Sequence, residues 1–195
     1  MSGLTVIRAA DHRVMRWKNG GGTTAEIAVS PPGGGLNDFD WRLSMANVET
    51  DGPFSTFPGI DRTLSILEGE GIRLRVGANV PIELTKSSDP HFFAADVSAS
   101  AELVAGPVLD LNVMSRRGRV AHAVRRLHLV EPVEIAAGGH DAAIFCAEGR
   151  LQVDTGDGQT DLAHHDTAIW SNGRTEARLR PDPFALVYTV EIRRV

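Results

Sequence analysis

The 195-residue sequence predicts an all-β protein built from two similar antiparallel halves. Apolar and polar residues alternate with a period of two along most segments, which is typical of half-buried strands. Glycine and proline clusters separate these segments at short intervals, as they do in β sandwiches and barrels. An apolar strand ending in Glu-Gly occurs twice, at 64–69 and 144–149, and an alternating strand follows each copy. The repeat predicts two barrels or sandwiches packed into one chain.

The expected elements are short and are joined by turns. One helical turn is expected at 11–16, with Asp11 as its N-cap. The proline- and glycine-rich runs at 31–35 and 51–59 are clear breaks. The expected strands, in order, are 4–8, 25–30, 41–46, 60–67, 72–76, 108–114, 120–130, 133–136, 142–148, 149–153, 162–170 and 185–192.

The composition is that of an ordinary globular protein, with 42% hydrophobic and 23% charged residues. Twenty basic residues against twenty-five acidic ones give a formal charge of −5, which disfavours a nucleic-acid partner. No apolar stretch is long enough to cross a bilayer, and residues 1–8 do not form a signal peptide. The single cysteine, Cys146, lies in an apolar run and suits a buried thiol in a reducing compartment. We therefore expect a cytoplasmic protein with neither a nucleic-acid nor a membrane partner.

Residues 17–27 are the most unusual stretch of the chain. An indole, a cation and an amide (17–19) precede three glycines, and two threonines and a carboxylate follow. Glycines allow the backbone to approach another surface closely. The stretch lacks the Lys-Ser/Thr of a triphosphate-binding loop. We expect it to close over the mouth of a cavity, with Asn19 and Gly21 as positioning groups; the alternative is a flexible glycine-rich loop.

Taken together, the motifs of the first half resemble those of the HutD/Ves family, which are bicupins of the cupin superfamily. The resemblance rests on residues 17–27, 40–44, 52–62, 67–69, 92–96 and 110–116, whereas the second half matches only in outline.

The resemblance implies two cupin-like antiparallel barrels, which we place at 1–118 and 119–195, with strands exchanged between the halves. It also implies a cytoplasmic protein associated with histidine utilisation, with a small carboxylate metabolite as its ligand.

Cupin enzymes hold a metal with His-x-His, a Glu and a later His, and this set is missing from the sequence. Residues 54–62, before the first Glu-Gly, contain no histidine. The neighbours His164 and His165 would point to opposite faces of a strand, or lie in a solvated turn. A metal needs several ligands that converge on one point. We expect no metal and no other cofactor, and no nucleophile motif assigns a catalytic residue.

Polar residues recur on one face of several expected strands of the first half. If they point into the first barrel, their arginines suit the capture of a carboxylate. Buried charges need partners, so Asp61 or Asp110 would pair with Arg42 or Arg62. The alternative is that these residues point outward or brace the barrel as structural ion pairs. The expected ligand-binding residues are Trp17, Asn19, Gly21, Arg42, Ser44, Phe57, Asp61, Arg62, Phe93, Asp110 and Asn112.

These observations favour a non-catalytic protein that binds a small anionic metabolite in the first barrel and senses or modulates histidine utilisation. One alternative is a metal-independent isomerase or hydrolase acting on a small acidic metabolite, with Asp61 or Glu26 at its centre. Another is a protein-interaction module. Cupin-type sheet edges often pair into dimers, so a homodimer is one state that the sequence allows.

Overall fold

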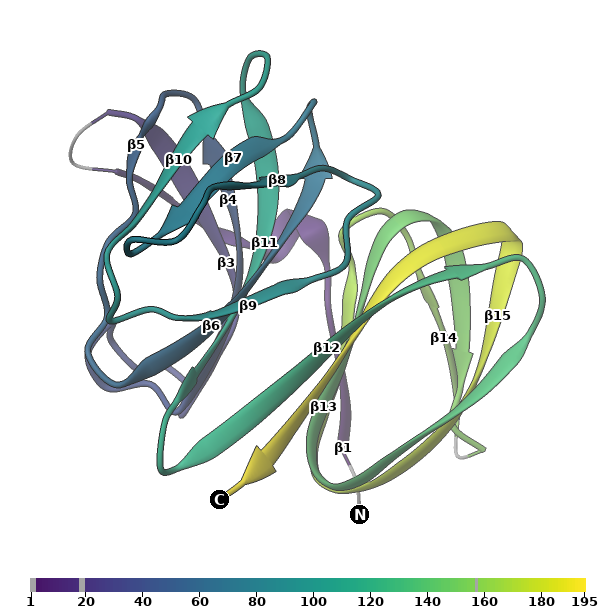
Figure 1. Cartoon of the computed structure of the whole chain (residues 1–195). Coiled ribbons are helices and arrows are strands. Elements are labelled where there is room, and N and C mark those ends of the chain that lie inside the picture. The colour runs from purple at the N-terminus through teal and green to yellow at the C-terminus, as the bar shows by residue number, and fades with distance from the viewer. Residues whose placement is uncertain (1–2, 18–19, 157) are drawn as a thin grey trace. The chain divides into compact units, whose positions relative to one another are not determined.

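Antiparallel strands make up most of the chain, as predicted (Figure 1). The computed structural model describes residues 3–17, 20–156 and 158–195, and describes the backbone alone at 3, 137–140 and 172–175. The elements in order are β1 (Gly3–Ile7), η1 (Ala9–Asp11, a 3₁₀ turn), β2 (Arg13–Arg16), β3 (Gly22–Ser30), β4 (Trp41–Val48), β5 (Gly52–Pro53), β6 (Ile60–Glu68), β7 (Ile72–Val76), β8 (Ile82–Leu84), β9 (His91–Ala94), β10 (Ala99–Leu103), β11 (Val108–Arg116), β12 (Val120–Leu129), β13 (Val133–Asp154), β14 (Gln159–Leu162) and β15 (Thr167–Arg194).

The chain divides into two compact units. The first unit comprises Arg13–Ala121 together with Val195, and the second comprises Met1–His12 together with His122–Arg194. The strand β1 therefore belongs to the second unit, where it pairs with β15. The predicted division at 118/119 lies close to the point at 121/122 where the chain passes from one unit to the other.

Two sheets form the first unit, and Figure 1 draws them as separate layers. One sheet has six strands in the order β2-β3-β4-β11-β6-β9, and the other has four in the order β5-β10-β7-β8. Leu64 and Ile66 of the large sheet pack in one core with Ile72 and Leu74 of the small sheet. These four side chains are nearly inaccessible to solvent, so the unit is a sandwich closed by its own apolar faces.

Long, bent strands form the second unit. The order of its strands is β1-β15-β13-β14, and β12 also pairs with β15. We expected separate strands at 133–136, 142–148 and 149–153, but they are continuous in β13. Register shifts along the β13–β15 ladder bend both strands without interrupting their pairing. The core of this unit includes the buried thiol of Cys146, as expected.

The predicted helical turn at 11–16 is wrong. The 3₁₀ turn covers Ala9–Asp11, and Arg13–Arg16 is the edge strand β2. Along this strand Arg13 lies opposite Glu26, and the ladder continues to the other end of β2. Pairing with β3 supplies the backbone hydrogen bonds that one helical turn could not, so tertiary context decides the conformation.

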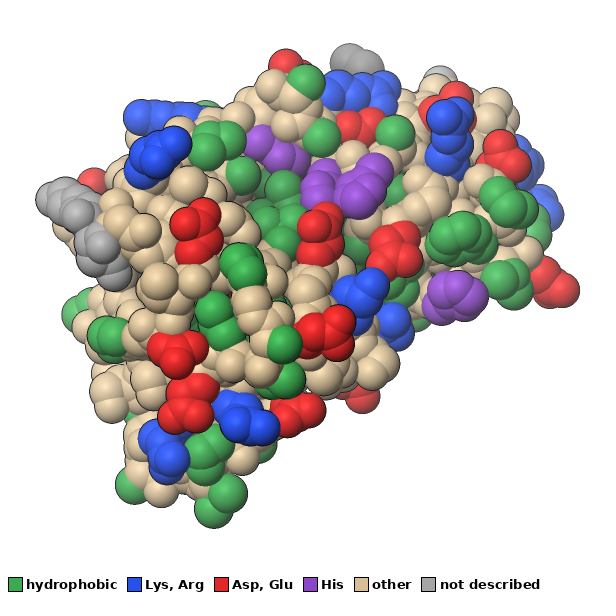
Figure 2. All heavy atoms as spheres, turned by 90° about the horizontal axis from the view of Figure 1, so that it is seen from above, with side chains coloured by type: hydrophobic (Ala, Val, Ile, Leu, Met, Phe, Trp, Pro, Cys, Tyr) green, Lys and Arg blue, Asp and Glu red, His purple; other side chains and the backbone are tan. Residues whose placement is uncertain are grey.

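Charged side chains of both signs are interspersed on the face drawn in Figure 2. Such a mixture produces no strong field of a single sign over that face. Among the described residues, no helix is long and apolar enough to cross a membrane.

The repeated Glu-Gly has the same structural cause in both units. Gly69 and Gly149 have φ values of +89° and +78°, in the left-handed region that favours glycine. A Cβ at Gly69 would lie 2.6 Å from the carbonyl oxygen of Pro107, and one at Gly149 would lie 2.1 Å from that of Phe184. Glycine is therefore required twice over, by the backbone conformation and by the contact.

Gly149→Ala is expected to destabilise the protein strongly, and Gly156→Ala serves as its matched control. Both glycines have positive φ, but a Cβ at Gly156 meets no atom within 4 Å. The control should lose about 1 kcal/mol through backbone strain alone. Gly149→Ala should lose roughly 1–3 kcal/mol more through overpacking. Thermal and urea unfolding followed by circular dichroism measure both; equal losses would show that the contact with Phe184 is relieved without cost.

Candidate functional site

A cavity of about 570 Å³ lies within the first unit. Its volume is in the range of small-molecule sites. The described lining consists of Met15, Arg16, Trp17, Thr24, Leu36, Arg42, Ser44, Ala46, Pro53, Phe54, Ser55, Phe57, Arg62, Asn112 and Met114. This lining offers guanidinium groups, hydroxyls and an amide against apolar walls.

The register of the large sheet brings the polar lining residues together. On β11, Met114 lies opposite Arg42 of β4 on one side and Arg62 of β6 on the other. One pleat along the strands, Asn112 lies opposite Ser44. Because side chains on one face repeat every second residue, these positions all face the cavity. The lining is thus a consequence of strand alternation across three neighbouring strands.

Arg62 is a buried cation that is held by one hydrogen bond and by two aromatic rings. Its side chain is 7% exposed, and its Nε donates to Oδ1 of Asn112 at 2.6 Å. The guanidinium carbon lies 4.6 Å from the ring centroid of Phe54 and 5.7 Å from that of Phe93. Among the described residues, Arg62 forms hydrogen bonds through Nε alone. The flat cation is therefore fixed by stacking and by one hydrogen bond, and its two terminal amino groups can serve a ligand.

Behind Arg62 lies the carboxyl group of Asp110, which is fully buried. The amide Nδ2 of Asn112 donates to Oδ1 of Asp110, while Oδ2 of Asp110 is buried without a hydrogen-bond partner among the described residues. Burial raises the pKa of Asp110 to about 6, although Arg62 and the amide groups of Asn112 and Ala46 act in the opposite direction. Burial also lowers the pKa of Arg62 to about 10, partly offset by Asp110.

A second guanidinium enters the cavity from β4. Arg42 is 5% exposed, donates through Nε to Oε2 of Glu26 at 2.8 Å and lies 3.4 Å from Oγ of Ser44. Its charge contributes to lowering the pKa of Arg62, which shows that the two cations act on one another. Glu26 and Asp110 are therefore the counter-charges that allow two arginines inside one unit.

Trp17 forms part of the cavity wall and is held in place by its indole. Its Nε1 donates to Oγ1 of Thr24 at 2.7 Å. A Cβ at Gly22 would lie 2.1 Å from the carbonyl oxygen of Asn47 and 3.2 Å from Cζ3 of Trp17, so only glycine fits beneath the indole. Trp17 and Thr24 of this stretch line the cavity, whereas none of the glycines at 20–22 belongs to the described lining.

Six of the eleven expected ligand-binding residues line the cavity: Trp17, Arg42, Ser44, Phe57, Arg62 and Asn112. Asn19 lies outside the described residues. Phe93 and Asp110 are buried behind the lining, where they contact Arg62 or Asn112. Gly21 is buried and accepts a hydrogen bond from the Glu49 amide, outside the described lining.

The expected pairing of the acidic residues is wrong in detail. Asp61 faces away from the cavity and forms an ion pair with Arg117 at 2.7 Å. It neighbours Arg62 on β6, and adjacent residues of a strand point to opposite faces. Arg42 takes Glu26 as its partner. Arg62 and Asp110 interact by charge, as expected, but their hydrogen bonds run through Asn112.

Several lining residues were missed by sequence reasoning. The helical turn expected at 11–16 gives no strand face to Met15 and Arg16, which line the cavity from β2. Thr24 could have been predicted from strand alternation, because it lies two residues before Glu26 on β3 and therefore on the same face. Leu36, Pro53, Phe54 and Ser55 reach the cavity from loops or a two-residue strand, where no periodicity reports orientation.

Outside the cavity, the thiol of Cys146 is unsuited to nucleophilic attack. Burial raises its pKa to about 11, and Asp166 acts in the same direction. The thiol is therefore protonated at neutral pH, as expected for a structural cysteine.

Two compact antiparallel β units in one chain agree with the bicupin fold, which the sequence resemblance implies and the solved structures match. The chain belongs to the HutD family, whose model matches residues 9–186. The family resemblance drawn from the sequence is therefore confirmed.

Two relatives in sequence support this assignment. The chain is 34% identical over 164 residues to Protein Ves of Citrobacter koseri, covering 84% of this chain and 81% of that protein. It is 41% identical over 114 residues to an uncharacterized 21.2 kDa protein in the hutC 3′ region of Pseudomonas putida, covering 58% and 59%.

Two solved structures match along nearly the whole chain. PA5104, a conserved protein of unknown function from Pseudomonas aeruginosa PAO1, has a TM-score of 0.92 and 31% identity, covering 98% of this chain and 99% of that one. HutD from Pseudomonas fluorescens SBW25 (formate condition) has a TM-score of 0.84 and 28% identity, covering 99% and 100%.

The buried carboxyl of Asp110 predicts a specific pH dependence of stability. Its pKa is raised from 3.8 to about 6 in the folded protein, so the native state holds this proton more tightly than the unfolded chain does. Stability should therefore fall as pH rises from about 4 to about 6 and change no further above that, by roughly 3 kcal/mol in all.

Asp110→Asn removes the titrating group and keeps its shape. Urea unfolding of both proteins at pH 4.5, 5.5 and 7.5 isolates the effect as a difference in midpoint. The urea midpoint of the variant should rise relative to that of the wild type as pH increases to 6. Parallel pH curves for the two proteins would show that Asp110 titrates alike in the folded and unfolded states.

Proposed function

We propose that this protein binds a small carboxylate metabolite in the cavity of the first unit and acts as a non-catalytic sensor or modulator of histidine utilisation. The observation that carries the proposal is the pair of buried guanidinium groups of Arg42 and Arg62, which face one cavity. Burying two cations is costly unless they are compensated. Two buried cations that face the same cavity are suited to binding an anion.

The charge around the cavity favours a carboxylate. Glu26 and Asp110 offset Arg42 and Arg62, and Arg16 adds a further cation to the described lining. Planar guanidinium groups can hold a carboxylate by two parallel hydrogen bonds. The terminal amino groups of Arg62 supply that geometry, while its Nε remains bonded to Asn112.

The apolar walls constrain the rest of the ligand. Met15, Leu36, Phe54, Phe57 and Met114 line the same cavity as the two arginines. Such a wall removes water from the ion pair and thereby strengthens it. A compact molecule with one carboxylate and a short apolar or unsaturated body fits this combination.

The biological setting comes from family membership. The HutD family name and the relative in the hutC 3′ region point to histidine utilisation. Acidic intermediates of histidine breakdown are therefore the first candidates for the ligand. The described lining presents donors and cations, a set suited to binding, and this favours a sensor over the metal-independent enzyme.

Arg62→Lys is expected to weaken ligand binding at least tenfold with little loss of fold. Lysine preserves the charge opposite Asp110 but cannot provide the planar fork. Isothermal titration calorimetry with a panel of small carboxylates, including formate and acidic intermediates of histidine breakdown, measures the affinity. The matched control is Arg119→Lys, since Arg119 pairs with Asp40 outside the described lining.

Two further comparisons sharpen the test. The amide derivative of a carboxylate that binds should not bind, because it lacks the charge. Recovery of the ligand unchanged after prolonged incubation is expected, whereas steady conversion to product would favour the enzyme. If no carboxylate binds, the proposal fails and the interaction module becomes the better hypothesis.

A further inference from the structure

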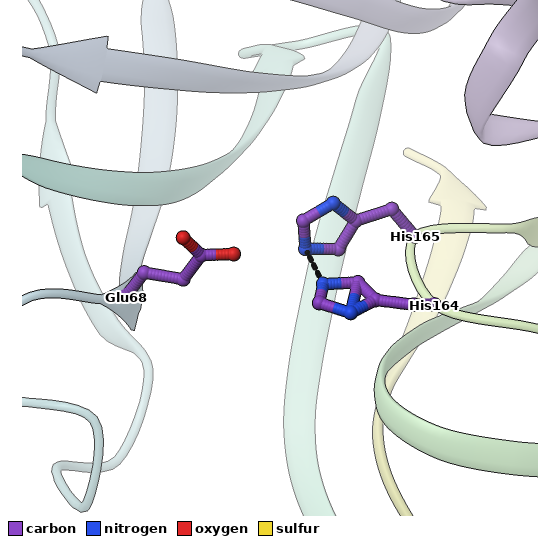
Figure 3. A group of neighbouring side chains, drawn as sticks. All are labelled: Glu68, His164 and His165. Atoms are coloured by element: carbon purple, nitrogen blue, oxygen red, sulfur yellow. Dashed lines mark hydrogen bonds between the residues drawn. The ribbon is translucent and has the colours of Figure 1, made fainter.

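Two adjacent histidines of the second unit meet at their ring nitrogens. His164 and His165 lie in the turn between β14 and β15, and their Nε2 atoms are 2.7 Å apart (Figure 3). The ring planes are nearly perpendicular, at 85°. Of the two placements expected for these histidines, the turn is therefore correct and the opposite faces of a strand are wrong. His165 has a φ of +66°, and this left-handed residue turns its ring toward its neighbour.

The turn is braced by Asp166, so its geometry does not depend on the histidines alone. The Asp166 carboxylate accepts hydrogen bonds from the amides of Ala9 and Ala163 and from Arg8, at 2.8–3.1 Å. The amide of His165 donates to the carbonyl of Cys146 at 2.7 Å. A strained backbone residue persists only when its surroundings fix it, and such residues gather at functional sites.

The ring of His165 is also fixed. It stacks on Phe145, whose side chain is fully buried, with centroids 5.5 Å apart and planes at 19°. Burial lowers the pKa of His165 to about 4, with His164 and His12 acting in the same direction. His164 is exposed, so the pair is open to solvent on its side.

We propose that the His164–His165 turn is a binding site for a divalent transition metal of tetragonal preference, Cu²⁺ or Ni²⁺, held by the two Nε2 atoms at adjacent coordination positions. With metal–nitrogen bonds of about 2.0–2.1 Å, ligands at 90° stand about 2.9 Å apart and tetrahedral ligands about 3.4 Å apart. The observed separation of 2.7 Å is nearer the first value. Square-planar and tetragonal nitrogen–oxygen sites are typical of Cu²⁺ and Ni²⁺.

Binding requires only a small rearrangement of protons. In the hydrogen-bonded pair one Nε2 carries the proton and the other accepts it. When both rings carry their proton on Nδ1, both Nε2 lone pairs face the ion, and no net proton is released. The carboxylate of Asp166 remains with Arg8 and the two amides and is not a ligand of the ion. The two histidines belong to the second unit, whereas the lining of the carboxylate cavity belongs to the first.

Titration with NiCl₂ and CuCl₂ tests the proposal on the full chain. The wild type should bind one ion of either metal, and electron paramagnetic resonance of the Cu²⁺ complex should show two equivalent imidazole nitrogens. Ni²⁺ should bind more tightly than Zn²⁺. His164→Asn should weaken Ni²⁺ binding at least tenfold, and it should leave the fold intact because His164 is exposed.

His165→Asn is the second variant, since asparagine tolerates the left-handed backbone. It should lose the ion as His164→Asn does, whereas His128→Asn, at an exposed histidine of the same unit, should bind as the wild type does. Equal affinity of wild type and His164→Asn, a spectrum with one nitrogen, or tighter binding of Zn²⁺ than of Ni²⁺ would each overturn the assignment.

Discussion

The hydrogen-bonded series Arg62–Asn112–Asp110 is the interaction on which the first unit depends. It places a cation and a carboxylate within a core where neither could remain alone. Removing one partner of a buried ion pair typically costs about 3–5 kcal/mol. The ladder of β11 with β6 must therefore keep its present register, because a slip of one residue would turn Arg62 and Asn112 away from one another.

Burying the Arg62–Asn112–Asp110 series lowers the stability of the fold, and this loss points to a functional role. The raised pKa of Asp110 and the lowered pKa of Arg62 both show that burial is not fully compensated by the pair. A set of well-packed apolar residues would hold the sheets together at least as well. Local rules of stability are broken mainly where function demands it, and here the break faces the cavity that also receives Arg42.

Strand periodicity predicted the all-β fold and placed several polar residues of the first unit on common strand faces, four of which line the cavity. The even positions of β4 and β11, among them Arg42, Ser44 and Asn112, face the cavity as alternation requires. The same rule could have removed Asp61, since it adjoins Arg62 on one strand and must face the other way. Loop residues such as Phe54 escape such reasoning, because their direction is set by tertiary packing and not by a repeating backbone.

Two kinds of turn in the chain differ in how far the sequence predicts them. A turn that needs a positive φ is often marked in the sequence by glycine. The repeated Glu-Gly at Gly69 and Gly149 predicts two such turns for that reason. His165 adopts the same backbone region without a glycine, held by Asp166 and by stacking on Phe145. Those supports come from Arg8, from the 3₁₀ turn that follows it and from β13, which are remote in sequence. Adjacent histidines can therefore converge on one ion only in a fold that first forces the turn, which is why spacing alone argued against a metal.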